Sequence, residues 1–390
     1  MENFNEGRAC LCALNRIFGF EPKIGLGLVR VLGGPEAVFK ANQNEITDFL
    51  RSCGRERYAS LVTGSAFESA AMELEELSLK GCRFIGFGES GYPEALAECE
   101  DPPLGLYYKG TLSPEEVFGK RPQVAIIGTR SLSYYGKDWC RNIVDALAKA
   151  KIKPMVVSGL ALGVDITAHR AALDFGLPTV GVMATGIDDI YPMQNAATGE
   201  MMASTPGCAL LTDFPPRTGA VKVNFLRRNR IIAGMCSATI LVESKIRGGG
   251  MMTARLAYSY DRDVFALPGR IDDPLSQGCN MLIRENIAAP IGNLADLVER
   301  LGLGKADISL KADFKAEVEN HYSELDEGSR RDILKIAMTV KSRRGIGMEE
   351  LCELSGWTFS KVSRIVNTLE CDGFISVDLL QHCSPRVAKG

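Results

Sequence analysis

A short basic segment contains the residue types that most clearly suggest chemistry. Between Arg217 and Arg230 the sequence RTGAVKVNFLRRNR holds five basic residues and no acidic one, with an aromatic ring at Phe225. Positive charges can hold phosphates while a ring stacks on any base, a combination that binds single-stranded nucleic acid. The alternative is a solvent-exposed basic face, but the segment leads directly into the apolar run IIAGMC. We therefore favour a position in a crevice and predict binding of single-stranded nucleic acid.

A second candidate site is the segment GTRSLSYYG, which follows the apolar run VAII. Gly128 would let a ligand approach the backbone closely. The segment also supplies groups that bind phosphate, namely Thr129, Arg130, Ser131 and Ser133. The motif G-x-G-x-x-G is absent, which disfavours a nicotinamide dehydrogenase. The alternative is a capped helix start with a surface arginine, but we predict phosphate binding.

A third candidate is the segment SKIRGGG, in which three glycines precede a predicted helix. Their backbone amides can form a cradle for an anion. Glu243 stands at the end of the strand before them, among elements that bind anions. Its carboxylate suits a hydrogen bond to a sugar or amino group, or it caps a helix, and both interpretations stay open.

Asp165 and His169 lie four residues apart on another predicted helix. Side chains at this spacing commonly pair for structural reasons, and no partnered nucleophile is identifiable. The chain has 3 His and no C-x-x-C pair among its 12 Cys, so a structural zinc site or a three-His metal centre is not expected. We predict no catalytic residue, no metal and no cofactor.

The elements that would position these groups are six short apolar runs separated by helical intervals. The runs are VAII, MVV, TVGVM, CALLT, ATILV and DVFAL. This alternation predicts an α/β fold with a Rossmann-like, doubly wound parallel sheet. In such sheets ligands lie outside the carboxyl ends of the strands, so we expect the candidate residues to meet at that rim.

Flanking regions predict three further parts. Residues 1–80 show helical spacing and resemble a small helical domain of the SAM or helix-hairpin-helix kind. In PKIGLGLVRVLGG a turn between packed helices is favoured over a phosphate-binding loop. Residues 81–303 form the Rossmann-like domain, 304–324 a polar linker, and 325–390 a winged helix of three helices followed by a strand.

The composition bounds the classes of partner. A net charge of −3 over 390 residues gives no global attraction to nucleic acid or anionic lipid, so any polyanion site must be local. The scattered cysteines are typical of buried small hydrophobes in a reducing compartment. No apolar stretch reaches the roughly 18 residues of a membrane helix. We predict a cytoplasmic protein without a membrane segment.

Several motifs occur together in an order that identifies a family. They are VAIIGTRSLSYYG, VVSGLALGVDITAH, TGIDDIYP, FLRRNRIIAG, ILVES, GGGMMTARLA, FALPG and GCNMLI. This chain closely resembles the DNA-processing protein family DprA, also called Smf. The resemblance implies a recombination mediator that binds single-stranded DNA, protects incoming DNA in natural transformation (competence), and loads the RecA recombinase as a homodimer. It implies no enzymatic turnover.

The resemblance also implies roles for individual residues. Arg130, Ser158 and Gly159 would hold phosphates. Lys222 would add a cation, and Phe225 would contact a base. Arg228, Asn229 and Arg230 of the RRNR motif would build the pocket. The full predicted interface consists of Gly128, Thr129, Arg130, Ser131, Ser158, Gly159, Leu160, Lys222, Phe225, Arg227, Arg228, Asn229, Arg230, Glu243, Gly249 and Gly250.

Two other classes of function stay open. The Rossmann-like core also resembles nucleotide-binding and nucleotide-hydrolysing proteins, although their P-G-G-x-G-T-x-x-E signature is not found. A transcription regulator would rest only on the winged helix. That region has ten basic and nine acidic residues from Leu325 to Gly390, which disfavours a dominant role in binding duplex DNA.

Overall fold

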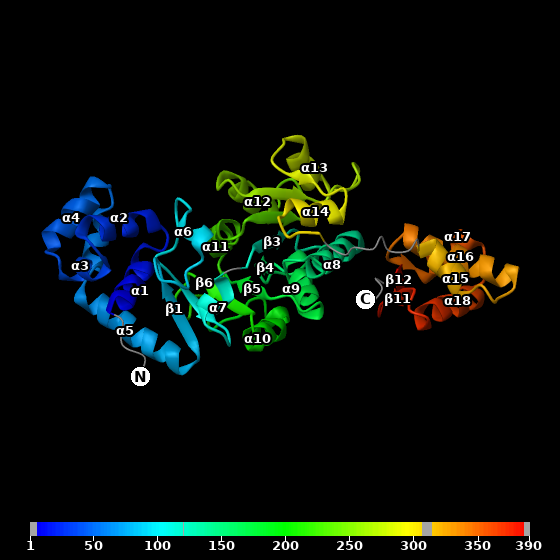
Figure 1. The fold of residues 1–390 in the computed structure, drawn as a ribbon, viewed down its shortest axis with the longest axis horizontal. Coiled ribbons are helices and arrows are strands. Elements are labelled where there is room, and N and C mark those ends of the chain that lie inside the picture. Colours follow the sequence, from blue (N-terminus) through cyan, green and yellow to red (C-terminus); the bar gives the residue numbers. More distant parts are fainter. Residues whose placement is uncertain (1–5, 120, 306–313, 386–390) are drawn as a thin grey trace. The chain divides into compact units, whose positions relative to one another are not determined.

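The structure is a computed structural model of the chain and describes residues 6–119, 121–305 and 314–385 (Figure 1). These residues form two compact units. The first holds the N-terminal helices and a large sheet, and the second holds residues 133–142 and the C-terminal region. No helix in the described ranges is long and apolar enough to cross a membrane.

The N-terminal part of the first unit is helical, as predicted. Its elements are α1 (Glu6–Phe18), α2 (Pro22–Leu32), α3 (Pro35–Lys40), α4 (Gln43–Ser52), the short 3-10 helix η1 (Glu56–Leu61) and α5 (Gly64–Leu79). Gly25 lies inside α2 and not in a turn between helices. A Cβ there would lie 3.0 Å from both Leu104 and Phe18, so this glycine serves close packing. The interhelical turn falls instead at Gly33, which caps α2 in the left-handed conformation.

The nine-stranded sheet has the order β1-β2-β6-β5-β4-β3-β7-β8-β9. The six predicted runs are β3 (Gln123–Ile127), β4 (Met155–Ser158), β5 (Thr179–Val182), β6 (Ala209–Thr212), β7 (Ala238–Leu241) and β8 (Asp263–Ala266). These six strands pair in parallel, and β9 (Ala289–Pro290) extends them. β1 (Cys82–Gly86) and β2 (Gly105–Lys109) add an antiparallel edge. The predicted α/β class and parallel sheet are confirmed.

Two hydrophobic cores lie on opposite faces of this sheet. Alternating residues of β6 show the division, since Leu211 packs in one core and Leu210 in the other. The first core is shared with α11 (Lys222–Met235), α12 (Gly249–Ser259) and α13 (Gln277–Arg284). The second includes the N-terminal helices and α10 (Ala196–Ser204). The remaining helices of the first unit are α6 (Glu94–Ala97), α7 (Pro114–Phe118), α9 (Val164–Asp174), η2 (Met193–Asn195) and α14 (Leu294–Arg300). The helix α8 (Tyr134–Ala148) is divided between the two units, since its residues up to 142 belong to the second.

The C-terminal unit has its own small core. Its elements are α15 (Phe314–His321), α16 (Glu327–Ser342), β10 (Ile346–Gly347), α17 (Met348–Ser355), α18 (Phe359–Cys371), β11 (Ile375–Val377) and β12 (His382–Pro385). The strands form an antiparallel sheet of order β10-β12-β11. This element order agrees with a winged helix.

α15 lies inside the range 304–324 that the sequence suggests is a linker. Val318 of this helix is buried in the same core as Ile336 and Leu369, so α15 belongs to the C-terminal core. The sequence pattern did not predict this helix, because only one or two apolar residues per turn face this core. Residues 306–313 of the predicted linker lie outside the described residues.

Candidate nucleic-acid interface

A cleft of about 650 Å³ opens at the carboxyl ends of the parallel strands, where β3 has β4 on one side and β7 on the other. This is the point at which the strand order reverses, the usual ligand position in such sheets. The cleft is lined by Ile127, Gly128, Thr129, Arg130, Ala161, Asp165, Tyr191, Ala220, Lys222, Phe225, Leu226, Arg228, Asn229, Ile232, Ser244, Lys245, Arg247, Gly248, Gly249, Gly250, Met252 and Thr253.

The loop after β3 forms one wall of the cleft, as expected. The backbone amide of Thr129 donates to the Glu243 carbonyl at 2.7 Å, which ties the loop to the end of β7. Gly128 is required for this approach because a Cβ would lie 2.8 Å from the same carbonyl. Arg130 is exposed at the cleft, whereas exposed Ser131 is not among its lining residues.

The loop after β4 lies beneath the cleft and not at its surface. Ser158, Gly159 and Leu160 are all buried. The Ser158 hydroxyl donates to the Ile126 carbonyl at 2.6 Å, and the Gly159 amide donates to Asp165 Oδ2 at 3.2 Å. Ser158 and Gly159, which were predicted to hold phosphates, therefore bind the protein itself, because Asp165 accepts from the amides that a phosphate would need. Leu160, the third predicted contact in this loop, is buried and is not among the cleft residues either.

Asp165 and Arg228 form the charged floor of the cleft. Arg228 is 3% exposed, and its guanidinium Nη1 donates to the carbonyls of Gly159, at 2.7 Å, and Val182. Burial lowers the pKa of Arg228 to about 10 and raises the pKa of Asp165 above its ordinary value. A Cβ at position 159 would lie 2.6 Å from this guanidinium, so Gly159 makes room for it.

His169 has a structural role in the same region. Its Nδ1 lies 2.7 Å from the Thr179 hydroxyl, which itself donates to the Val156 carbonyl. The Thr179 oxygen must therefore accept from the His169 ring. Burial lowers the pKa of His169 to about 3, so the ring is neutral at neutral pH. Within the described ranges no hydrogen bond joins His169 to Asp165.

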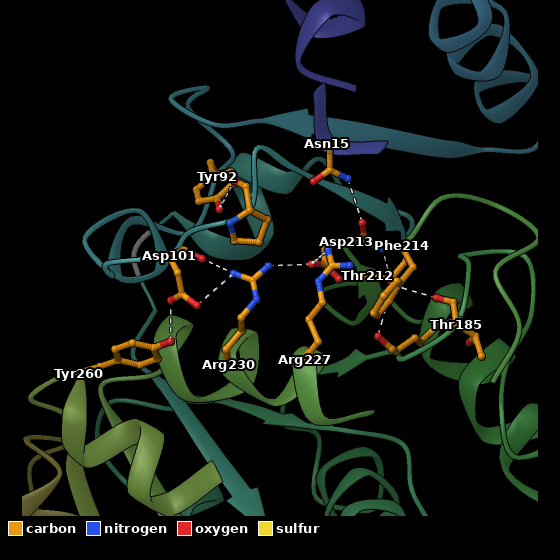
Figure 2. Close-up of polar contacts among 12 residues, drawn as sticks. Asn15, Tyr92, Asp101, Thr185, Thr212, Asp213, Phe214, Arg227, Arg230 and Tyr260 are labelled. Carbon is orange, nitrogen blue, oxygen red and sulfur yellow. Dashed lines mark hydrogen bonds and ion pairs between the residues drawn. The ribbon is translucent and has the colours of Figure 1, made fainter. Parts of the chain in front are cut away.

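α11 divides the basic segment between two faces. Lys222 is exposed at the cleft, and Asn229 lines it. Arg227 and Arg230 instead point away from the cleft to Asp213, whose Oδ2 accepts from them at 2.6 and 2.8 Å (Figure 2). The prediction that the whole RRNR motif faces the ligand therefore disagrees with this placement, because residues 227 and 230 fall on another side of the helix from residues 222 and 229.

Phe225 lies in the cleft with partners that the sequence did not suggest. Its ring centroid is 5.7 Å from that of Tyr191, and the Arg130 guanidinium carbon is 5.0 Å from the Phe225 ring. Phe225 is half-buried and Tyr191 is exposed. Tyr191 comes from the loop TGIDDIYP between β5 and η2, where an aromatic residue in a rim loop was the available signal.

The segment after β7 forms the opposite wall. Gly249 is exposed at the first turn of α12, where amides have no partner inside the helix. Gly250 is buried because α12 packs closely on the β3 loop. Glu243 is only 1% exposed and is not among the lining residues. Two exposed cations that the prediction omitted, Lys245 and Arg247, also line this wall and were visible as basic residues in SKIRGGG.

The cleft is strongly positive although the chain is slightly acidic. Five of its lining residues are basic and one is acidic. Four of these cations are exposed, namely Arg130, Lys222, Lys245 and Arg247. Among the described residues no group of three or more His, Cys, Asp or Glu side chains is arranged to hold a metal ion. The arrangement can bind a polyanion and stack a ring against Phe225 or Tyr191.

The residues that build this cleft lie in a region that is similar to known DNA-processing proteins. A model of the family "DNA recombination-mediator protein A" matches residues 83–302. The DNA processing protein DprA of Streptococcus pneumoniae is 39% identical over 194 residues, which are 50% of this chain and 66% of that protein. Protein Smf of Synechocystis sp. is 39% identical over 210 residues, 54% of this chain and 52% of that protein. The chain thus spans about half to two thirds of the length of these relatives.

Two solved structures of DNA processing protein A are also similar to this chain. DNA processing protein A from Streptococcus pneumoniae matches with a TM-score of 0.53 and 29% identity, over 71% of this chain and 97% of that chain. DNA processing protein A from Helicobacter pylori, whose structure describes a single-stranded DNA binding mode, matches with a TM-score of 0.50 and 30% identity, over 56% of this chain and 95% of that chain. The resemblance seen in the sequence is confirmed, and this chain belongs to the DNA recombination-mediator protein A family.

Proposed function

We propose that this chain is a recombination mediator that binds single-stranded DNA in the cleft beside α11. The observation that carries the proposal is the placement of four exposed cations around Phe225 and Tyr191. Cations can track the phosphates of one strand while the two rings receive unpaired bases. The membership of the family and the single-stranded DNA binding mode described for the Helicobacter pylori relative support the same function.

The cleft favours single strands over duplex for a geometric reason. Phe225 is half-buried inside the cleft, so a base must leave its own stack to reach the ring. In a duplex, bases are already paired and stacked, and their release costs free energy. The net charge of −3 gives the chain no global attraction to the phosphates of a duplex that would compensate for this cost.

The proposed activity is binding and not turnover. Asp165 holds the amides of Gly159 and Ala161, and His169 holds Thr179. Each of these titratable groups has a structural partner, so neither is left to act on a nucleotide. We propose that the chain works in the cytoplasm, where incoming single strands meet the recombination machinery.

Anisotropy with a labelled mixed-sequence single strand tests DNA binding. Four phosphate contacts predict a slope of log affinity against log salt near −3, from roughly −0.7 for each contact. A blunt duplex of the same length should bind much more weakly. Equal affinity for the two forms, or an affinity that salt leaves unchanged, would refute the single-strand proposal.

The proposal has two finer parts. The chain loads RecA onto single-stranded DNA, and it acts as a homodimer. The support is the family resemblance, which implies protection of incoming DNA in natural transformation. The test follows RecA filament assembly on single strands with the wild-type chain and with Lys222→Ala. We expect faster assembly with the wild type, a smaller effect with the variant, and a dimer in sedimentation. No effect on RecA would remove the loading step while leaving DNA binding intact.

A further inference from the structure

The side of α11 that faces away from the cleft is built into a buried ionic network. Arg230 Nη2 donates to Asp213 Oδ2 at 2.8 Å, and its Nη1 donates to the Asp101 carbonyl. The Asp101 carboxylate in turn accepts from the Tyr260 hydroxyl at 2.7 Å. Figure 2 shows this chain of contacts running from Tyr260, just after α12, through Asp101 and Arg230 of α11 to Asp213, just after β6. The side of α11 away from the cleft is therefore held in place by groups that do not line the cleft.

Arg227 is the part of this network that reaches the N-terminal helices. Its guanidinium carbon lies 4.5 Å from the centroid of Phe20 and 4.6 Å from that of Phe214, while Nη2 donates to Asp213 Oδ2 at 2.6 Å. The planar cation is thus held between two rings and one carboxylate. Burial lowers the pKa of Arg227, while the charge of Asp213 opposes this shift.

Residues in and just after α1 lie around the Arg227 guanidinium and leave space for it. Asn15 Nδ2 donates to the backbone carbonyl of Asp213 at 2.9 Å, which joins α1 to the residue whose carboxylate holds both arginines (Figure 2). A Cβ at Gly19 would lie 2.8 Å from Arg227 Nη2, so only glycine leaves room there. Phe20 keeps a ring over Arg227 although it is 61% exposed. An exposed ring in this position contributes little to a core.

We propose that the N-terminal helical region positions α11 through Phe20, Asn15 and Arg227, and so sets the orientation of Phe225 and Lys222 in the cleft. Phe20 is a positioning residue, because it contacts Arg227 and does not line the cleft. The effect on DNA rests on the proposed function, whereas the effect on α11 does not. The N-terminal region therefore controls DNA affinity without contacting DNA.

Phe20→Ala is the test variant because its exposure limits any loss of folding stability. Loss of one cation–π contact should weaken single-strand binding about two- to five-fold. The salt slope should stay unchanged because no cation is removed. Phe20→Tyr keeps the ring and should restore affinity, whereas Phe20→Leu should not. Val31→Ala, at an exposed apolar residue of α2, is the matched control and should bind as the wild type does.

A double-mutant cycle with Phe225→Ala separates positioning from direct contact. If Phe20 acts by orienting Phe225, the loss from Phe20→Ala should shrink once the Phe225 ring is absent. If the two losses multiply independently, or if Phe20→Ala binds DNA as the wild type does, the proposal is overturned.

Hydrogen exchange supplies a readout that needs no DNA. Backbone amides of residues 222–229 should exchange faster in Phe20→Ala than in the wild type or in Val31→Ala. Unchanged exchange there would contradict the positioning role even if DNA binding were altered. If the wild type failed to bind single strands, the proposed function would fall, and exchange in α11 would still decide whether Phe20 positions this helix.

Discussion

Phe225→Ala distinguishes a base-stacking ring from a ring that only packs. In the structure Phe225 is half-buried in the cleft, contacts Tyr191 and Arg130, and belongs to neither of the two cores that flank the sheet. The variant removes a ring and no charge. Its effects on stability and on DNA affinity therefore come from different partners and can be measured separately.

The magnitudes follow from those partners. The stability loss comes from one aromatic pair and one cation–π contact, together about 1 to 2.5 kcal/mol. A fully buried ring would cost about 3 to 5 kcal/mol. The affinity loss corresponds to one base stack of about 1 to 3 kcal/mol, or roughly five- to 150-fold. The salt slope should not change, because every phosphate contact remains.

The assay combines thermal unfolding with single-strand anisotropy on the same preparation. Tyr258→Ala is the matched control, because Tyr258 is 53% exposed on α12 and is not among the cleft residues. We expect a modest stability loss and a large affinity loss for Phe225→Ala, with neither in the control. A stability loss near that of a buried ring, together with unchanged affinity of the folded protein, would refute the assignment of Phe225 to the DNA site.

Three further predictions concern charge. Lys222→Ala removes an exposed cleft cation, so a salt series should show weaker binding and a slope shallower by roughly 0.7, whereas an unchanged slope would place Lys222 off the phosphate path. Asp213→Ala leaves Arg227 and Arg230 buried without their shared carboxylate, so denaturant unfolding should show a loss of about 3 to 5 kcal/mol. A loss below about 1 kcal/mol would contradict the role of that network. For His169, burial lowers the pKa in the folded state to about 3 from an ordinary 6.5. Between these two values the unfolded chain binds a proton at His169 and the folded chain does not. Stability should fall on acidification from about pH 6.5, by up to about 1.4 kcal/mol per pH unit, and His169→Gln should show a shallower fall over pH 6 to 4. Identical pH profiles would disprove this.

The parallel sheet and its ligand rim could be predicted from local sequence patterns. Each of the six apolar runs ends in small or polar residues, and strand formation depends on such short-range features. The topology rule for doubly wound sheets then places the candidate loops at one rim. Gly128, Arg130, Lys222 and Phe225 were found in this way, and all four line the observed cleft.

The direction in which each arginine points could not be predicted in the same way. Helical periodicity shows that Arg227 and Arg230 lie away from Lys222, but it does not say which face meets the cleft. That choice depends on Asp213, Asp101 and the end of α1, which are distant in the sequence.

The burial of the loop after β4 could not be predicted from the sequence either. A small, polar strand end predicts exposed amides, yet Asp165 captures the amide of Gly159 and Arg228 occupies the space above it. Local patterns in the chain were therefore sufficient to predict the fold class, the rim and the family. Which cations remain available to a ligand and which are neutralised inside the protein depends on long-range contacts, because a buried charge needs an opposite charge wherever the fold provides one.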